Sequence, residues 1–217
     1  DLWLEAACVK HAVAVVTVNE GIADLLQQRF GCAPSVIRNV HDARLDREGG
    51  RTIRDSLALP HDSFLLVVVG NAKPGMAIEE VCEALKSLPA RVHVAFLGAG
   101  YHEHLQTIRS HKVEQRVHFP EPVAPTEVVP FIRTADAGIV LYHAQSLNRL
   151  NALPNGFFQP IAAGLPILYP DLPEMRRIAT KYGLGVLIDP RSPSSIVKEV
   201  SSVMDNLEGL MRLALRA

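Results

Sequence analysis

The sequence predicts an α/β fold in which helices cover both faces of a parallel sheet. Short apolar runs rich in β-branched residues alternate with segments of helical apolar spacing along most of the chain. The run at 64–70, FLLVVVG, is apolar throughout, as expected of a strand buried on both faces. At 217 residues, the chain is long enough for one large domain, or for one domain and part of another.

The strands are predicted from runs of four to eight residues that Gly, Pro or polar residues bound on each side. The polar stretch at 41–62, which contains Gly49 and Gly50, is instead typical of a boundary loop. The expected strands are 12–18, 35–40, 64–70, 91–98, 116–119, 137–142, 166–169 and 185–189.

The helices are predicted from apolar spacing and from capping residues. Gly31 closes a helix at 21–31, and the helix at 76–88 has its apolar residues on one face. Thr126 and Asp171 are expected as N-caps, the latter in a capping box with Glu174. Further helices are expected at about 101–110, from Gly156 or Phe157 onward, and from 193 with Ser192 as N-cap and Pro193 in the first helical position. This alternation predicts a Rossmann-like sheet.

Composition excludes several classes of protein. The net charge of −1 offers nothing that would attract nucleic acid. Cys8, Cys32 and Cys82 are far apart, which argues against zinc and a disulfide framework and favours a reducing, cytoplasmic compartment. His102 and His104 point to different faces of a helix, so solvated side chains are favoured over a metal site. The longest apolar run is too short to span a bilayer.

The loops that follow the strands are the expected ligand site, because ligands of open parallel sheets bind at the carboxyl ends of strands. Several of these loops are rich in Gly or Pro, although ordinary connections also use these residues. The GAG at 98–100 is a weak signal alone, because no GxGxxG follows the first strand. The loops are 70–75, 98–104, 120–125, 143–156 and 170–174.

The order and spacing of these pieces resembles the C-terminal half of GT-B glycosyltransferases of group 1, the family 4-like branch. A strand–helix–strand segment comes first, and the units of a donor-binding domain follow it. The stretch at 146–168 resembles the loop and Leu-Pro-Asn-Lys helix start that hold the sugar nucleotide in that family. The segments that carry the resemblance are AVVTVNEGIADLLQQRFGCAPSVIRNVHD, LLVVVGNAKPGMAIEEVCEAL, VHVAFLGAG, RVHFPEPVAPTEVVPFIRTADAGIVLY, SLNRLNALPNGFFQPIAAGLPIL and PEMRRIATKYGLGVLIDP.

The resemblance implies a site for a nucleoside-diphosphate sugar, with no separate cofactor and no metal. The loop and helix start near Gly156 would offer N–H groups to the diphosphate, and a basic residue after the first strand would neutralise it. We therefore expect Gly156→Val to weaken nucleotide binding while costing the fold only about 1 kcal/mol, and Gly156→Lys to hold or raise affinity. The expected donor-binding residues are Gly70, Asn71, Lys73, Gly98, Gly100, Val123, Asn148, Leu153, Pro154, Asn155, Gly156 and Gln159.

The chain departs from the family pattern at several of these positions. The two acidic residues of the family fall on Ala152 and Gln159, of which only Gln159 is polar. Gly156 stands where Lys is common, and Asn71 stands where Arg is expected. Lys73 is therefore the candidate phosphate ligand, with a solvated loop lysine as the alternative, and Gln159 could equally be a solvated residue.

The resemblance implies a glycosyltransferase that moves a sugar to an acceptor hydroxyl in the synthesis of cell-surface polysaccharide or glycoconjugates. Residues 51–217 would form the nucleotide-sugar-binding domain, and residues 1–50 a linker or the remnant of an N-terminal domain. The opening DLWLEAACVKHA reads as a helix from mid-protein, so we expect a fragment. Expected partners are the nucleotide sugar, a sugar or lipid-linked acceptor, the N-terminal domain with the general base, and a membrane surface contacted peripherally. A non-catalytic binding or scaffolding module is the alternative.

Overall fold

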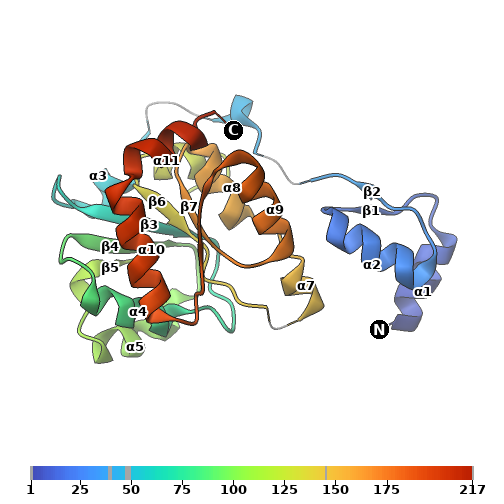
Figure 1. Cartoon of the computed structure of the whole chain (residues 1–217), viewed down its shortest axis with the longest axis horizontal. Helices are drawn as coiled ribbons and strands as arrows, with labels where there is room; N and C mark the ends of the chain where they lie inside the picture. The colour runs from blue at the N-terminus through green and yellow to red at the C-terminus, as the bar shows by residue number, and fades with distance from the viewer. Residues whose placement is uncertain (1, 39–40, 47–49, 145, 217) are drawn as a thin grey trace.

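A computed structural model describes residues 2–38, 41–46, 50–144 and 146–216. In these residues a six-stranded parallel sheet has the strand order β5-β4-β3-β6-β7-β8 (Figure 1). The predicted α/β fold is therefore confirmed. The strands are β3 (Phe64–Val69), β4 (Val92–Leu97), β5 (Val117–His118), β6 (Ala137–Ile139), β7 (Ile167–Pro170) and β8 (Gly185–Ile188).

Helices cover both faces of this sheet (Figure 1). Alternate residues of β3 enter different cores, because successive side chains of a strand point to opposite faces. Leu66 and Val68 pack with α4 (Ile78–Ser87) and α10 (Pro193–Asp205). Leu65 and Val67 lie on the opposite face and pack with α3 (Ile53–Leu57) and α6 (Val128–Ile132). The remaining helices of this part are η2 (Tyr101–His104), α5 (Leu105–Ser110), η3 (Glu114–Arg116), α7 (Leu147–Leu150), α8 (Asn155–Ala162), α9 (Pro173–Tyr182) and α11 (Leu207–Ala214).

The N-terminal segment forms a second, smaller unit that lies to one side of the main sheet (Figure 1). Its strands β1 (Val16–Thr17) and β2 (Ser35–Val36) pair in parallel, and α1 (Leu2–His11) and α2 (Glu20–Phe30) accompany them. The strands are shorter than predicted, and residues 39–40 lie outside the described part. The short helix η1 (Ala43–Leu45) follows. The domain division after residue 50 stays a prediction.

Two of the predicted helix ends are confirmed. Gly31 takes the left-handed conformation that ends α2, with φ 66°. Ser192 caps α10 by accepting a hydrogen bond from the Ser195 N–H, and Pro193 occupies the first helical position. Both ends depend on neighbouring residues alone, so the sequence could specify them.

Two other predicted caps are wrong. Pro173 starts α9, so Leu172 takes the N-cap position, and the Asp171 carboxylate accepts a hydrogen bond from Arg176 instead. Glu174 likewise pairs with Arg177 at 2.7 Å, which removes the predicted capping box. Glu127 rather than Thr126 precedes α6, and its carboxylate accepts from the Ala124 N–H.

The structure also contains helices that the sequence reading did not identify. The expected loop at 41–62 contains η1 and α3, and α3 begins with a capping box between Thr52 and Asp55. The helix α11 continues the chain after α10. Finally, α8 begins at Asn155, one residue before the predicted start, and contains Pro160.

Candidate functional site

The strand order identifies the crevice in which a ligand of this sheet would bind. Chain connections run in opposite directions from β3 and from β6, so the order reverses between these two neighbouring strands. In doubly wound folds, ligands bind outside the carboxyl ends of the strands at such a reversal. The loop after β3 begins at Gly70, and the loop after β6 contains Tyr142 and the half-buried His143. These two loops define the candidate site.

The helix α8 begins directly over the end of β3. A Cβ atom at Gly156 would lie 2.2 Å from the carbonyl oxygen of Val69, so only glycine fits there. The cavity between this helix start and the strand ends holds only about 10 Å³. The expectation that Gly156→Val costs the fold only about 1 kcal/mol is therefore wrong, and Gly156→Lys meets the same clash. Packing against the strand, rather than a ligand, explains this glycine.

The first turn of α8 offers backbone donors to an anion. Pro154 is the N-cap residue and supplies no capping side chain, while the Phe157 N–H bonds to the Pro154 carbonyl. Within the described part of the chain, the N–H groups of Asn155 and Gly156 have no acceptor. Unpaired N–H groups at the positive end of a helix dipole favour a phosphate or carboxylate.

The loop after β3 reaches over the same crevice. Lys73 is exposed, and its ammonium group lies 5.6 Å from the ring centroid of Tyr142. Met76, three residues further on, forms an isolated antiparallel bridge with Tyr142. The loop after β3 is thereby joined to the loop after β6. The sequence reading missed Tyr142, although an aromatic residue at the carboxyl edge of a strand could have drawn attention to it.

The loops after β3 and β4 are joined to each other by hydrogen bonds. Asn71 Oδ1 accepts from the Ala99 N–H at 3.0 Å, and the Tyr101 hydroxyl donates to the Gly70 carbonyl at 2.7 Å. Burial raises the pKa of Tyr101, which keeps the hydroxyl protonated as a donor. A Cβ atom at Gly98 would lie 2.2 Å from the Gly70 oxygen. Asn71 and Gly98 therefore have structural roles that hold these loops in place.

The remaining residues that the family resemblance singles out near this crevice are Gly100 and four residues in α7, in α8 and in the turn between them. At Gly100 φ is +88°, and an added Cβ atom would lie 3.2 Å from that of Ala72. Leu153 is buried in the core under α8, and Ala152 precedes it. Gln159 lies in the second turn of α8 and is half-buried. Asn148 lies in α7, with its side chain outside the described part.

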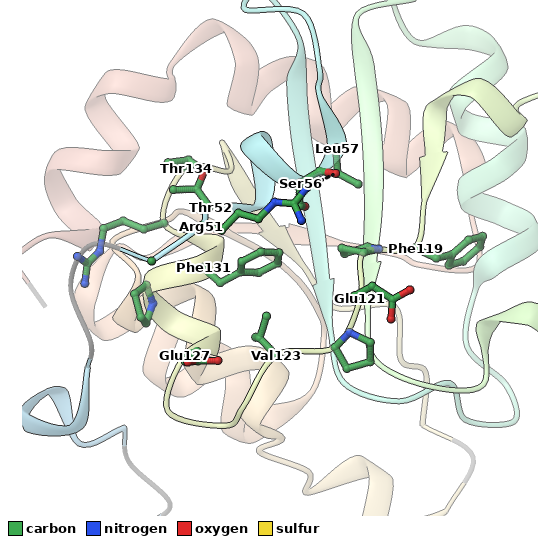
Figure 2. Close-up of a pocket in the computed structure, with 15 residues that line it drawn as sticks. Arg51, Thr52, Ser56, Leu57, Phe119, Glu121, Val123, Glu127, Phe131 and Thr134 are labelled. Atoms are coloured by element: carbon green, nitrogen blue, oxygen red, sulfur yellow. Dashed lines mark hydrogen bonds between the residues drawn. The ribbon is translucent and has the colours of Figure 1, made fainter.

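Val123 lies apart from these residues, in the loop after the edge strand β5. It lines a cavity of about 750 Å³ between α3, α6 and that loop. Figure 2 shows Phe131 and Val123 facing this cavity, with Arg51 and Thr52 toward one end and Glu127 toward the other. Val123 is the one predicted donor-binding residue among its described lining residues. The structure therefore brings together the predicted residues that follow β3 and β4 and those at the start of α8. Val123 instead lies at a separate cavity.

Comparisons with known proteins agree with this architecture. Residues 50–217 match the family described as Glycosyl transferases group 1. The D-inositol 3-phosphate glycosyltransferase 1 of Catenulispora acidiphila is 24% identical over 220 residues, which cover 93% of this chain and 51% of that protein. The chain thus spans about half the length of this curated relative.

Solved structures show the same fold at low sequence identity. HepE from Anabaena, solved in complex with UDP and glucose, has a TM-score of 0.80 at 15% identity, covering 98% of this chain and 59% of HepE. Sucrose-phosphate synthase from Thermosynechococcus elongatus has a TM-score of 0.76 at 14% identity, covering 98% of this chain and 54% of that one.

These findings define the class of protein. The fold is the Rossmann-like α/β fold of the C-terminal domains of GT-B glycosyltransferases. The chain belongs to the glycosyl transferases group 1 family. Among the helices of the described residues, none combines the length and the apolar character needed to cross a bilayer.

Proposed function

We propose that this chain is the donor-binding half of a glycosyltransferase that uses a nucleoside-diphosphate sugar. The observation that carries the proposal is the pair of N–H groups at Asn155 and Gly156, which have no acceptor among the described residues and lie at the reversal of strand order. Lys73 adds a cation on the neighbouring loop. A diphosphate satisfies both features, because backbone donors and a lysine are a common phosphate-binding pair.

In the proposed reaction the glycosyl unit moves to an acceptor hydroxyl and the nucleoside diphosphate leaves. Negative charge grows on the leaving diphosphate as the glycosidic bond breaks. Fixed donors at the start of α8 and the Lys73 ammonium group then stabilise the transition state more than the bound substrate. We place the general base and most of the acceptor site in an N-terminal domain, with residues 1–50 as its remnant or a linker and residues 51–217 as the donor domain.

The comparisons support the donor class of this proposal. HepE was solved with UDP and glucose, and the curated relative is an inositol-phosphate glycosyltransferase. We propose an analogous role in polysaccharide or glycoconjugate synthesis, with a sugar or lipid-linked acceptor and no further cofactor. Cys8, Cys32 and Cys82 are all unpaired, which suits a cytoplasmic location.

A non-catalytic nucleotide-sugar-binding module is the second candidate. Ala152 and Gln159 replace the two acidic positions that the family resemblance implies, and Asn71, which stands where Arg is expected, accepts a hydrogen bond from the Ala99 N–H. Such a module would bind the nucleotide without transferring the sugar. Sugar transfer by a longer chain that includes the N-terminal half distinguishes it from an enzyme.

The binding claim is tested by a thermal-shift titration of this chain with UDP, GDP, ADP and inorganic phosphate. A ligand present at about 100 times its Kd adds about 2.7 kcal/mol to the free energy of unfolding. We expect at least one nucleotide to raise Tm at millimolar concentration, and phosphate to raise it less. If no nucleotide shifts Tm, the proposed donor site is wrong.

A further inference from the structure

A buried polar contact joins the N-terminal segment to the chain just before α8. Asn19 follows β1, is fully buried, and caps α2 by accepting a hydrogen bond from the Ile22 N–H at 2.8 Å. Its Nδ2 group donates to the carbonyl oxygen of Asn151 at 2.6 Å, across 132 positions of sequence. Only one orientation of the amide group serves both partners, so the side chain is fixed at each end.

Asn151 is itself held tightly at the end of α7. It is 8% exposed, and its Nδ2 group donates to the Leu147 carbonyl at 2.9 Å. A Cβ atom on Gly21, in the first turn of α2, would lie 2.4 Å from Asn151 Oδ1 and 3.5 Å from Glu174 Oε1. The first turn of α2, the end of α7 and the first turn of α9 therefore meet at one point.

Because these polar groups are buried, water cannot take the place of a partner that is lost. Asn19, Asn151 and Glu174 are three of the five buried polar residues in the described part of the chain. A buried donor or acceptor that loses its partner carries a desolvation penalty. Because of this penalty, the position of residue 151 depends on the N-terminal segment. Four residues later the chain begins α8, whose first N–H groups have no acceptor in the part of the chain that the structure describes.

We propose that Asn19 is a positioning residue for the donor site, acting through the Asn151 carbonyl on the start of α8. The inference rests on the proposed function, because it assumes that those N–H groups bind the diphosphate. Asn19 touches neither the nucleotide nor the sugar in this account. It fixes where the turn from α7 into α8 lies, and so couples the N-terminal segment to donor affinity.

Asn19→Asp separates the two tasks of this side chain. Aspartate caps a helix as well as asparagine does, so α2 keeps its N-cap. The second carboxylate oxygen replaces the donor and faces the Asn151 carbonyl oxygen, which turns an attraction into a repulsion. Asn19→Ser also keeps a capping group but ends one atom earlier. The matched control is Ser192→Ala, which removes the N-cap of α10 on a helix outside this contact.

The first readout needs no ligand. Hydrogen–deuterium exchange of the Asn19→Asp chain should speed up for peptides covering residues 147–157 and stay unchanged for β3 and β4. Ser192→Ala should leave residues 147–157 unchanged. Unchanged exchange at 147–157 in both Asn19 variants overturns the inference. Gly21→Ala provides an independent steric check, since it favours helix α2 by propensity but pushes on Asn151, and should also speed exchange there.

The second readout is the Kd for UDP measured by calorimetry. We expect Asn19→Asp to raise Kd about threefold to tenfold, the effect of losing one buried hydrogen bond, and Ser192→Ala to leave it unchanged. Equal Kd values for wild type and Asn19→Asp overturn the coupling to donor affinity. If the wild-type chain binds no nucleotide while exchange at 147–157 responds, the proposed function fails and the structural coupling stands.

Discussion

The crevice at the reversal of strand order and the cavity beside α6 differ in size and in the hydrogen-bond donors that they present. The crevice presents backbone N–H groups and a lysine, and the cavity under the start of α8 holds only about 10 Å³. The cavity beside α6 holds about 750 Å³, and its lining combines the apolar Phe119 and Phe131 with charged residues of both signs, such as Arg51 and Glu127. Size alone would place a ligand in the cavity beside α6, whereas the backbone donors at the start of α8 and the reversal of strand order place the proposed diphosphate at the crevice.

The largest expected effect comes from a substitution that disrupts the packing of α8 against the end of β3. Gly156→Val places a side chain against the Val69 carbonyl, which lies 2.2 Å from an added Cβ atom. We expect a loss of about 3 kcal/mol in the free energy of unfolding, measured by urea denaturation. Gly31→Ala is the control, because its Cβ atom meets nothing within 4 Å and only the left-handed φ of 66° opposes it. A loss no larger than about 1 kcal/mol for Gly156→Val contradicts the account.

The next largest effect concerns the Lys73 ammonium group at the crevice. Lys73→Ala should weaken UDP binding about tenfold, in line with the loss of one contact between a cation and a phosphate. It should also reduce the salt dependence of Kd, because that contact is screened by added ions. Calorimetry at two salt concentrations measures both quantities. Arg51→Ala, at the cavity beside α6, is the control and should change neither. If Lys73→Ala leaves Kd and its salt slope intact, Lys73 is a solvated loop residue.

The smallest effect concerns the edge strand β5, whose end leads to the cavity. His118 Nε2 lies 2.9 Å from His93 Nδ1, and burial together with His93 lowers the pKa of His118 to about 4. An unfolded histidine titrates near 6.5, so between these values the unfolded chain binds a proton that the native chain does not. The contribution of His118 to the free energy of unfolding is therefore fully present above pH 6.5 and is lost as the pH falls toward 4.

The expected loss between pH 7 and pH 5 is about 1 kcal/mol, after discounting for partial solvent exposure. Denaturation of the wild type and of His118→Gln at both pH values measures it. The variant should lose less stability over this interval than the wild type. The matched control His61→Gln changes an exposed histidine and should follow the wild type. Equal losses in the free energy of unfolding for wild type and His118→Gln between pH 7 and pH 5 would contradict the lowered pKa of His118.

The sequence predicted those features that depend on neighbouring residues. The cap at Ser192 and Pro193, the end of α2 at Gly31, and the buried strand at 64–69 follow from local propensity and apolar pattern. The predicted cap at Asp171 failed although its motif looked right. Pro173 moved the start of α9 by one residue, and Arg176 recruited the carboxylate.

The candidate site was predictable in position but not in detail. The loops after the strands were located from the alternating pattern, and the structure brings those of β3, β4 and β6 together. The reason for Gly156 depends on Val69, which lies far away in sequence, so no local signal could show it. The contact between Asn19 and Asn151 is non-local for the same reason, although an Asn before a helical pattern signals an N-cap.

The central claim is that a nucleoside diphosphate binds at the start of α8, and NMR tests it most directly. The chain labelled with ¹⁵N is titrated with UDP while the amide resonances are followed. The account predicts the largest shifts at Asn155 and Gly156, with smaller shifts at Lys73 and its neighbours in the loop after β3. Shifts confined to residues around the cavity beside α6, such as Phe131 and Arg133, would contradict it, as would saturation without any change at Asn155 or Gly156.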